Sequence, residues 1–203
     1  MIHKYKYWIF EKALDPNLCD AIVKIGLSKQ KKKALVLGFE EKEREGKLTE
    51  KDLKEINEIR QSNVAWLNEP WLYKILQNYL EMANVRSGWE YQWSHSEEIQ
   101  FTEYKDGCFY DWHADSDDNS TREKVCRKLS MSVSLTDPKE YEGGEFEFDY
   151  RNKTKTSAIE EVTRLKPKGS ILVFPSYIFH RVKPVTKGTR HSLVMWTLGN
   201  LWR

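Results

Sequence analysis

The first 90 residues combine charged stretches with apolar positions at helical spacing. Between residues 16 and 28, apolar side chains recur every three or four positions, Asp15 can cap the helix and Pro16 suits its first turn. A second stripe predicts a helix with Asn68 as its cap and Pro70 in its first turn. Its members are Leu72, Ile75, Leu76, Tyr79, Leu80 and Ala83. We therefore expect both helices to bury one face against a sheet.

After Glu90 the period changes to short β-rich runs between turn residues such as Asp106-Gly107 and Gly143-Gly144. The predicted strands are residues 5–10 and, after Glu90, residues 99–104, 128–135, 145–150, 158–163, 170–174, 179–185 and 190–198. Many short strands with regular turns suggest a jelly roll. We expect one mainly β domain with flanking helices over residues 1–203: a double-stranded β-helix (jelly-roll) core over residues 90–203, with N-terminal helices over residues 1–89 packed on it.

A densely charged segment, residues 39–58, interrupts the N-terminal part. It has no apolar stripe strong enough for a core, so we expect an exposed insertion with a short helix after Thr49. Such an insertion is either a plain surface loop or a lid beside an active site. The basic run over residues 29–33 leaves a similar choice, between a solvated helix end and a contact for an acidic partner.

The composition of the chain indicates the size of its core, the partners that its charge does not favour and the compartment to expect. The chain of 203 residues has 8 Trp, 10 Tyr and 8 Phe, enough for a sizeable core, and its net charge of +2 gives no electrostatic argument for nucleic acid or a membrane surface. Cys19, Cys108 and Cys126 are odd in number and widely spaced, so neither a disulfide framework nor a zinc site is indicated. No apolar run suggests a signal peptide or a membrane span, so we expect a cytoplasmic setting.

The candidate chemistry begins with His113 and Asp115, two residues apart. On a strand their side chains share a face, and the polar stretch that follows predicts that they lie at a strand end. His180 follows another apolar run and supplies a third ligand. Two histidines and one carboxylate form the facial triad of non-heme Fe(II) oxygenases. The alternatives are a surface histidine, a turn-forming aspartate and a core imidazole bonded to a carbonyl group.

A second signal follows ten residues after His180. Alternation along the strand places four residues on one face: Arg190, Ser192, Val194 and Trp196. If Trp196 is buried, the arginine on the same face is buried too and needs an anion. A dicarboxylate that chelates iron at one end would supply that anion at its other end, because guanidinium pairs bidentately with carboxylate. The alternative is an ion pair with an acidic residue of the chain.

These residues belong to a longer pattern. It consists of Tyr104…Gly107…Tyr110-X-X-His113-X-Asp115, then Leu135-Thr-Asp-Pro-X-X-Tyr141-X-Gly-Gly-Glu145, then Phe174-Pro-Ser…His180-X-Val182-X-Pro-Val-Thr-X-Gly-X-Arg190, and Trp196. The pattern resembles the prolyl 4-hydroxylase-like group of 2-oxoglutarate- and Fe(II)-dependent dioxygenases, and within that group the bacterial branch often called PKHD-type hydroxylases. The resemblance covers about Gln100 to Trp196, roughly half of the chain.

The resemblance implies an enzyme that hydroxylates an unactivated C–H bond, with a prolyl residue of a peptide or protein as the favoured substrate. It implies Fe(II), with 2-oxoglutarate and O₂ as cosubstrates, and it suggests bound ascorbate. The implied iron ligands are His113, Asp115 and His180. The implied contacts of 2-oxoglutarate are Arg190, which would bind the C5 carboxylate and completes the catalytic set, with Tyr104 and Ser192. The implied lining of the substrate pocket is Gln100, Tyr110 and Trp196.

Two departures from related groups bear on the substrate. Collagen-type prolyl hydroxylases usually carry lysine at the position of Arg190, which weakens the transfer of a collagen-like substrate. Nucleic-acid demethylases of the superfamily carry a second arginine downstream, which residues 191–196 lack. The open alternatives are a dioxygenase of a free amino acid, a nucleic acid or a small metabolite, and a non-catalytic jelly-roll binding module. The sequence leaves the prime substrate, the oligomeric state and the walls formed by residues 116–124 undetermined.

Overall fold

The computed structural model describes residues 4–36, 39–116, 125–150 and 159–201. Its helices are α1 (Pro16–Ser28), α2 (Glu40–Arg44), α3 (Glu50–Ile59), α4 (Pro70–Arg86) and the 3₁₀ helix η1 (Thr163–Leu165). Its strands are β1 (Trp8–Phe10), β2 (Lys32–Lys33), β3 (Arg60–Gln61), β4 (Asn63–Leu67), β5 (His95–Ser96), β6 (Ile99–Tyr104), β7 (Phe109–His113), β8 (Val125–Ser134), β9 (Tyr141–Gly143), β10 (Phe146–Asp149), β11 (Ile159–Glu161), β12 (Ile171–Pro175), β13 (Phe179–Val182), β14 (Val185–Gly188) and β15 (Arg190–Asn200).

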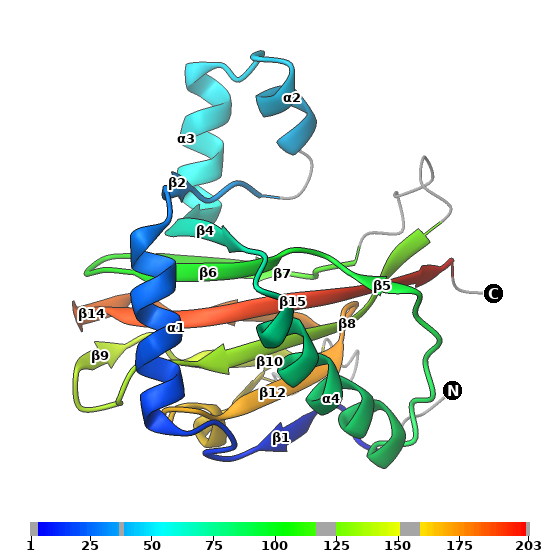
Figure 1. Cartoon of the computed structure of the whole chain (residues 1–203). Coiled ribbons are helices and arrows are strands. Elements are labelled where there is room, and N and C mark those ends of the chain that lie inside the picture. Colours follow the sequence, from blue (N-terminus) through cyan, green and yellow to red (C-terminus); the bar gives the residue numbers. More distant parts are fainter. Residues whose placement is uncertain (1–3, 37–38, 117–124, 151–158, 202–203) are drawn as a thin grey trace.

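The strands pair into a larger and a smaller sheet. The larger sheet has the order β1-β12-β8-β15-β6-β4-β2, with β5 paired to β15, and the smaller sheet has the order β11-β10-β13-β7-β3. Strands β14 and β9 form a separate antiparallel pair. Figure 1 shows α1 and α4 lying across one face of the larger sheet. The predicted mainly β fold with helices packed on a sheet-rich core is confirmed.

The outer face of the larger sheet and the two long helices enclose the main apolar core. Fully buried residues of α1 and α4, such as Ile22 and Leu76, pack with Phe101 of β6 and Leu193 of β15. Helix α1 lies very close to the sheet, because a Cβ atom at Gly26 would lie 2.4 Å from Cγ of Phe101. The opposite face of the larger sheet and the smaller sheet enclose a second, aromatic-rich cluster. That cluster includes Phe146, Phe148, Leu172, Phe174 and Val182.

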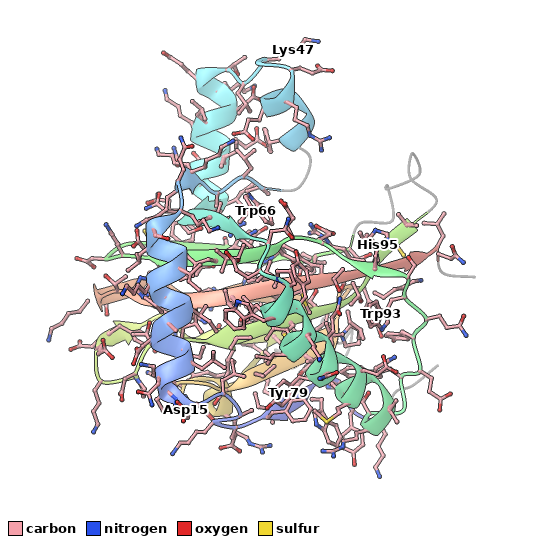
Figure 2. The ribbon with its side chains drawn as sticks, viewed as in Figure 1. Asp15, Lys47, Trp66, Tyr79, Trp93 and His95 are labelled. Carbon is pink, nitrogen blue, oxygen red and sulfur yellow. The ribbon has the colours of Figure 1, made fainter. Side chains whose placement is uncertain are left out.

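The two predicted long helices are present, with one correction. Helix α1 has the predicted bounds, and Oδ1 of Asp15 accepts a hydrogen bond from the N–H of Asn17 at 2.8 Å. Helix α4 is capped by Glu69 without a side-chain hydrogen bond, so the prediction of Asn68 as its cap is wrong. Pro70 fixes the first turn, which makes the residue directly before it the cap. Tyr79 of α4, labelled in Figure 2, donates to the carbonyl oxygen of Ala13 at 3.1 Å.

The charged insertion over residues 39–58 is helical rather than a loop. Helices α2 and α3 stand away from the sheet at the top of Figure 1. Thr49 and Asp52 form a reciprocal capping box that starts α3, as the prediction of a helix after Thr49 requires. One side of α3 is anchored through Ile56, which is only 4% exposed.

The N-terminal 89 residues are less helical than expected. They also supply β1, β2 and β4 to the larger sheet and β3 to the smaller one. The predicted strand over residues 5–10 contains β1. The other three strands were not predicted, because they are short and their alternation is too brief to detect from the sequence. The predicted strand over residues 179–185 divides into β13 and β14, which pair with different partners. No helix in the described ranges is long and apolar enough to cross a membrane.

Candidate active site

Two neighbouring strands of the smaller sheet bring the candidate metal ligands together. His113 ends β7 and stands opposite His180 of β13. Asp115 follows two residues later, and its N–H donates to the carbonyl oxygen of Ser176 at 2.9 Å. An oxygen of Asp115 lies 3.7 Å from Nε2 of His113, and the other lies 3.5 Å from Nε2 of His180. Ligand atoms of all three residues lie within 4.8 Å of one another, which suits a single metal ion.

Main-chain carbonyl groups hold both imidazoles in one orientation. Nδ1 of His113 lies 2.8 Å from the oxygen of Asp111, and Nδ1 of His180 lies 2.9 Å from the oxygen of Ile178. A carbonyl oxygen can only accept, so each Nδ1 carries the proton. Each Nε2 therefore directs its lone pair toward Asp115, the arrangement that metal-ligating histidines commonly have. His180 is bonded to a carbonyl, as the core-imidazole alternative proposed, and is still available as a ligand.

The charges of this group also suit a metal. Burial, together with the neighbouring His180, holds the pKa of His113 well below its ordinary value. Burial would raise the pKa of Asp115, but the two histidines and Arg127 outweigh it, and this pKa is lowered. The cluster therefore presents a neutral imidazole beside a carboxylate. Those are the protonation states in which histidine and aspartate bind metal.

Arg190 begins β15 and is 2% exposed. Its Nη1 atom has no hydrogen-bond partner among the described residues, and no ion pair there involves it, contrary to the internal-salt-bridge alternative. Its guanidinium carbon lies 5.4 Å from the ring of Tyr104, the residue opposite on β6. Gly144 leaves room for it, because a Cβ atom there would lie 2.9 Å from Cδ of Arg190. A buried cation with an unused donor needs an anionic partner.

The nine predicted site residues line one cavity of about 570 Å³. Alternation along β15 places Ser192 and Trp196 on the same wall as Arg190. Nε1 of Trp196 is buried without an acceptor among the described residues, a second donor that a ligand oxygen would satisfy. The ring of Tyr110 stacks on His113, with 3.4 Å between centroids. The expected wall over residues 116–124 lies, from residue 117 onward, outside the described residues.

Among the charged residues of this cavity that sequence reasoning did not assign to the site are Arg60, Glu97 and Arg127. Arg127 was not recognised because the pairing of β8 with β15 shifts between Thr197 and Leu198. Strict alternation along β8 would place its side chain on the outer face of the sheet, away from the cavity. Arg60 lies in a strand too short to show a pattern. Glu97 lines the cavity beside Arg127, with which its side chain pairs, and no local pattern in the sequence indicates that contact.

Comparison with known proteins identifies the family of this part of the chain. Residues 99–198 match the family model described as the 2OG-Fe(II) oxygenase superfamily. This part of the chain belongs to that superfamily. A PKHD-type hydroxylase of Aliarcobacter butzleri is 36% identical over 99 residues, which are 47% of this chain and 41% of that protein. The PKHD-type hydroxylase PiuC of Pseudomonas aeruginosa is 32% identical over 100 residues, which are 48% of this chain and 41% of that protein. The match thus spans less than half the length of these relatives.

Solved structures of prolyl hydroxylases share the fold over nearly the whole chain. A prolyl hydroxylase of Trichoplax adhaerens, in complex with a hypoxia inducible factor peptide, has a TM-score of 0.69 at 18% identity and covers 96% of this chain, with 84% of its own chain matched. The viral collagen prolyl hydroxylase of Paramecium Bursaria Chlorella virus-1 has a TM-score of 0.65 at 21% identity, and the match covers 97% of both chains. At these identities the likeness establishes the jelly-roll fold alone.

The superfamily implies Fe(II), 2-oxoglutarate and O₂, and the residues present fit them. Two imidazole nitrogens and one carboxylate are a donor set suited to ferrous iron. The buried, unused Nη1 donor of Arg190 suits the far carboxylate of a dicarboxylate. Both features open into the same cavity.

Proposed function

We propose that the chain is a 2-oxoglutarate- and Fe(II)-dependent dioxygenase that hydroxylates an unactivated C–H bond. The observation that carries the proposal is the presence, in one cavity, of a convergent His113–Asp115–His180 set and an arginine without an anionic partner. When bound, iron with 2-oxoglutarate and O₂ supplies the oxidative chemistry, which yields succinate, CO₂ and a hydroxylated product.

The protein's own residues supply binding and orientation. His113, Asp115 and His180 would hold the iron, and the carbonyl groups of Asp111 and Ile178 keep the imidazoles turned toward it. Arg190 would bind the C5 carboxylate of 2-oxoglutarate. Burial strengthens that pairing because water does not compete for the guanidinium.

Five other residues complete the proposed site. Tyr104, 3% exposed and opposite Arg190, would donate a hydrogen bond to the same carboxylate, with Ser192 beside it. Tyr110 and Trp196 form walls beside the metal ligands, and they exclude water from the reacting atoms. Gln100 lines the wall next to them and is tied to Arg60 by a hydrogen bond of 2.6 Å.

The favoured substrate in this proposal is a prolyl residue of a peptide or protein. Support comes from the motif resemblance and from the fold shared with prolyl hydroxylases that act on peptides. The cavity of about 570 Å³ reaches from β2 and α2 to the end of β15, which suits a chain crossing the site better than a free amino acid. Ascorbate as a reductant and a cytoplasmic setting remain predictions.

The decisive experiment measures succinate formed from 2-oxoglutarate with Fe(II) under air. The wild-type chain should form succinate, and His113→Ala should not, because it removes one of the three ligands. A control, His95→Ala, changes an exposed histidine outside the cavity and should keep turnover. Equal turnover in wild type and His113→Ala would contradict the metal assignment. Mass spectrometry of proline peptides and free amino acids, scored for one added oxygen atom, then tests the substrate.

A further inference from the structure

Besides the exposed Arg44, three buried or half-buried arginines line the cavity, and their charges are neutralised differently. Arg127 is paired with both carboxylate oxygens of Glu97, each at 2.6 Å, so this pair carries no net charge. Arg190 is assigned above to the cosubstrate. Arg60 is 7% exposed, and its charge is neutralised by no carboxylate among the described residues.

The partners of Arg60 are all uncharged. Its Nε donates to the hydroxyl of Ser62 at 3.0 Å, Nη1 donates to the carbonyl of Leu35 at 3.2 Å, and Nη2 donates to Oε1 of Gln100 at 2.6 Å. The guanidinium also stacks on the ring of Tyr110, with its carbon 4.4 Å from the centroid. These three bonds use three of five N–H donors, which leaves two for a further acceptor. A buried cation held only by neutral groups is costly unless an anion joins it.

The proposed cosubstrate does not supply that anion. The positive charges of ferrous iron and Arg190 together equal the negative charges of Asp115 and of the two carboxylates of 2-oxoglutarate. The loaded site would therefore be neutral before Arg60 is counted, and Arg60 would remain as one uncompensated positive charge in a cavity of low dielectric.

The exposed residues that line the cavity on the side of Arg60 carry mostly positive charge as well. Lys32 and Lys33 of β2 and Arg44 of α2 line this side of the cavity and are exposed, and none has an acidic partner among the described side chains. Glu43 is the acidic residue described on this side, and it is also exposed. Figure 1 shows β2 and the α2–α3 hairpin at the same edge of the larger sheet. Positive charge therefore gathers at one side of the cavity, whereas the side formed by Glu97 and Arg127 is neutral.

We infer that the substrate is an acidic peptide segment, with a carboxylate side chain near the hydroxylated residue that binds Arg60 while its flank runs past Lys32, Lys33 and Arg44. This inference rests on the proposed function and adds its substrate class. A peptide is favoured because the positive side extends from a buried arginine to an exposed rim, farther than one small anion reaches. The hairpin would then act as a specificity element for the sequence around the target residue.

The test compares nine-residue peptides with a central proline that differ only in charge. In the first pair, one peptide carries glutamate at the three positions before the proline and the other carries glutamine there. In the second pair, the glutamate or glutamine residues stand at the three positions after the proline. Binding is measured by fluorescence anisotropy on anaerobic enzyme with Fe(II) and 2-oxoglutarate, so it does not depend on turnover. One acidic peptide should bind about tenfold more tightly than its glutamine counterpart, as a charge-assisted bond predicts.

Variants then locate the effect. Arg60→Gln should abolish the preference for glutamate over glutamine. Because Arg60→Gln can disturb Tyr110, Lys33→Glu and Arg44→Glu test the same idea at exposed positions, and each should reduce the preference by about threefold. Lys47→Glu is the matched control: it makes the same charge change at the tip of the hairpin (Figure 2), outside the cavity, and should leave the preference unchanged.

Several outcomes would overturn the inference. These are equal binding of the acidic and glutamine peptides, an equal effect of Lys47→Glu, or stronger binding of a single-stranded oligonucleotide than of either peptide. A loss of 2-oxoglutarate affinity in Arg60→Gln as large as the loss of peptide affinity would assign the arginine to the cosubstrate instead. Succinate formation by the wild type distinguishes the two levels: if it occurs without a charge preference, the inference fails while the proposed function stands.

Discussion

The two faces of β15, in the larger sheet, differ in composition although one strand forms both. On β15, Leu193 and Met195 point to the helices and are fully buried in the main core. Arg190, Ser192 and Trp196 point the other way, into the cavity. The outer face stabilises the fold through apolar burial, and the inner face holds polar groups in fixed positions. Substitutions on the two faces should therefore separate stability from ligand binding.

The largest expected effect is on the inner side, at Asp115. Asp115→Ala should lower the affinity for Fe(II) more than about 100-fold, because loss of a direct ligand should exceed the about 10–100-fold loss known for outer partners. Metal binding can be measured by titration with Fe(II) under anaerobic conditions. The matched control is Asp111→Ala, an exposed carboxylate on the same strand. Equal losses in both variants would mean that the carboxylate of Asp115 is not a ligand.

On the outer face, Leu193→Ala should destabilise the fold by about 2–5 kcal/mol, because it leaves a cavity in the main core. Urea unfolding measures the free energy, and the affinity of the folded fraction for 2-oxoglutarate should not change. Val194→Ala alters the next residue, which is half-buried and lines the cavity, and should cost less stability. A reversed order of the two unfolding free energies would contradict the assignment of faces.

Arg190→Ala should weaken 2-oxoglutarate binding by about 10- to 100-fold, as loss of a charge-assisted hydrogen bond predicts. The dissociation constant can be measured by calorimetry on the metal-loaded protein. Arg181→Ala is the control, since that arginine already pairs with Glu147 at 2.7 Å. An unaltered dissociation constant in Arg190→Ala would remove this residue from the cosubstrate site.

The smallest expected effect is on the pH dependence of the unfolding free energy, and it arises from Glu103 on the outer face. Burial alone would raise the pKa of Glu103, but Lys31, 3.0 Å away, outweighs it and the pKa is lowered. The ionised carboxylate therefore stabilises the fold above its unfolded pKa of about 4.3, and this contribution disappears as the pH falls through the folded value. Glu103→Gln should be slightly less stable at pH 7 and should lose less stability than wild type on acidification below about pH 5. Parallel curves of unfolding free energy against pH would refute this.

Local patterns in the sequence predicted much of this structure. The stripe of apolar residues and the Asp15-Pro16 pair defined α1, because a helix is built from contacts three and four residues apart. Period-two alternation from Arg190 to Trp196 gave the correct inner face of β15, because side chains on a regular strand point to alternate sides. The residues His113, Asp115 and His180 were identified by type and spacing, and the fold brings them together.

Only the tertiary structure decided where charges are compensated. The glutamate that pairs with Arg127, the absence of one beside Arg60 within the described ranges, and the unused donor of Arg190 depend on contacts between distant segments. The sequence determined which chemical groups the protein has and which face of a regular element they occupy, because those depend on near neighbours. Strand pairing, the shift in β8 and the packing of the α2–α3 hairpin determined which groups are left for a ligand, because burial and pairing are set by long-range contacts.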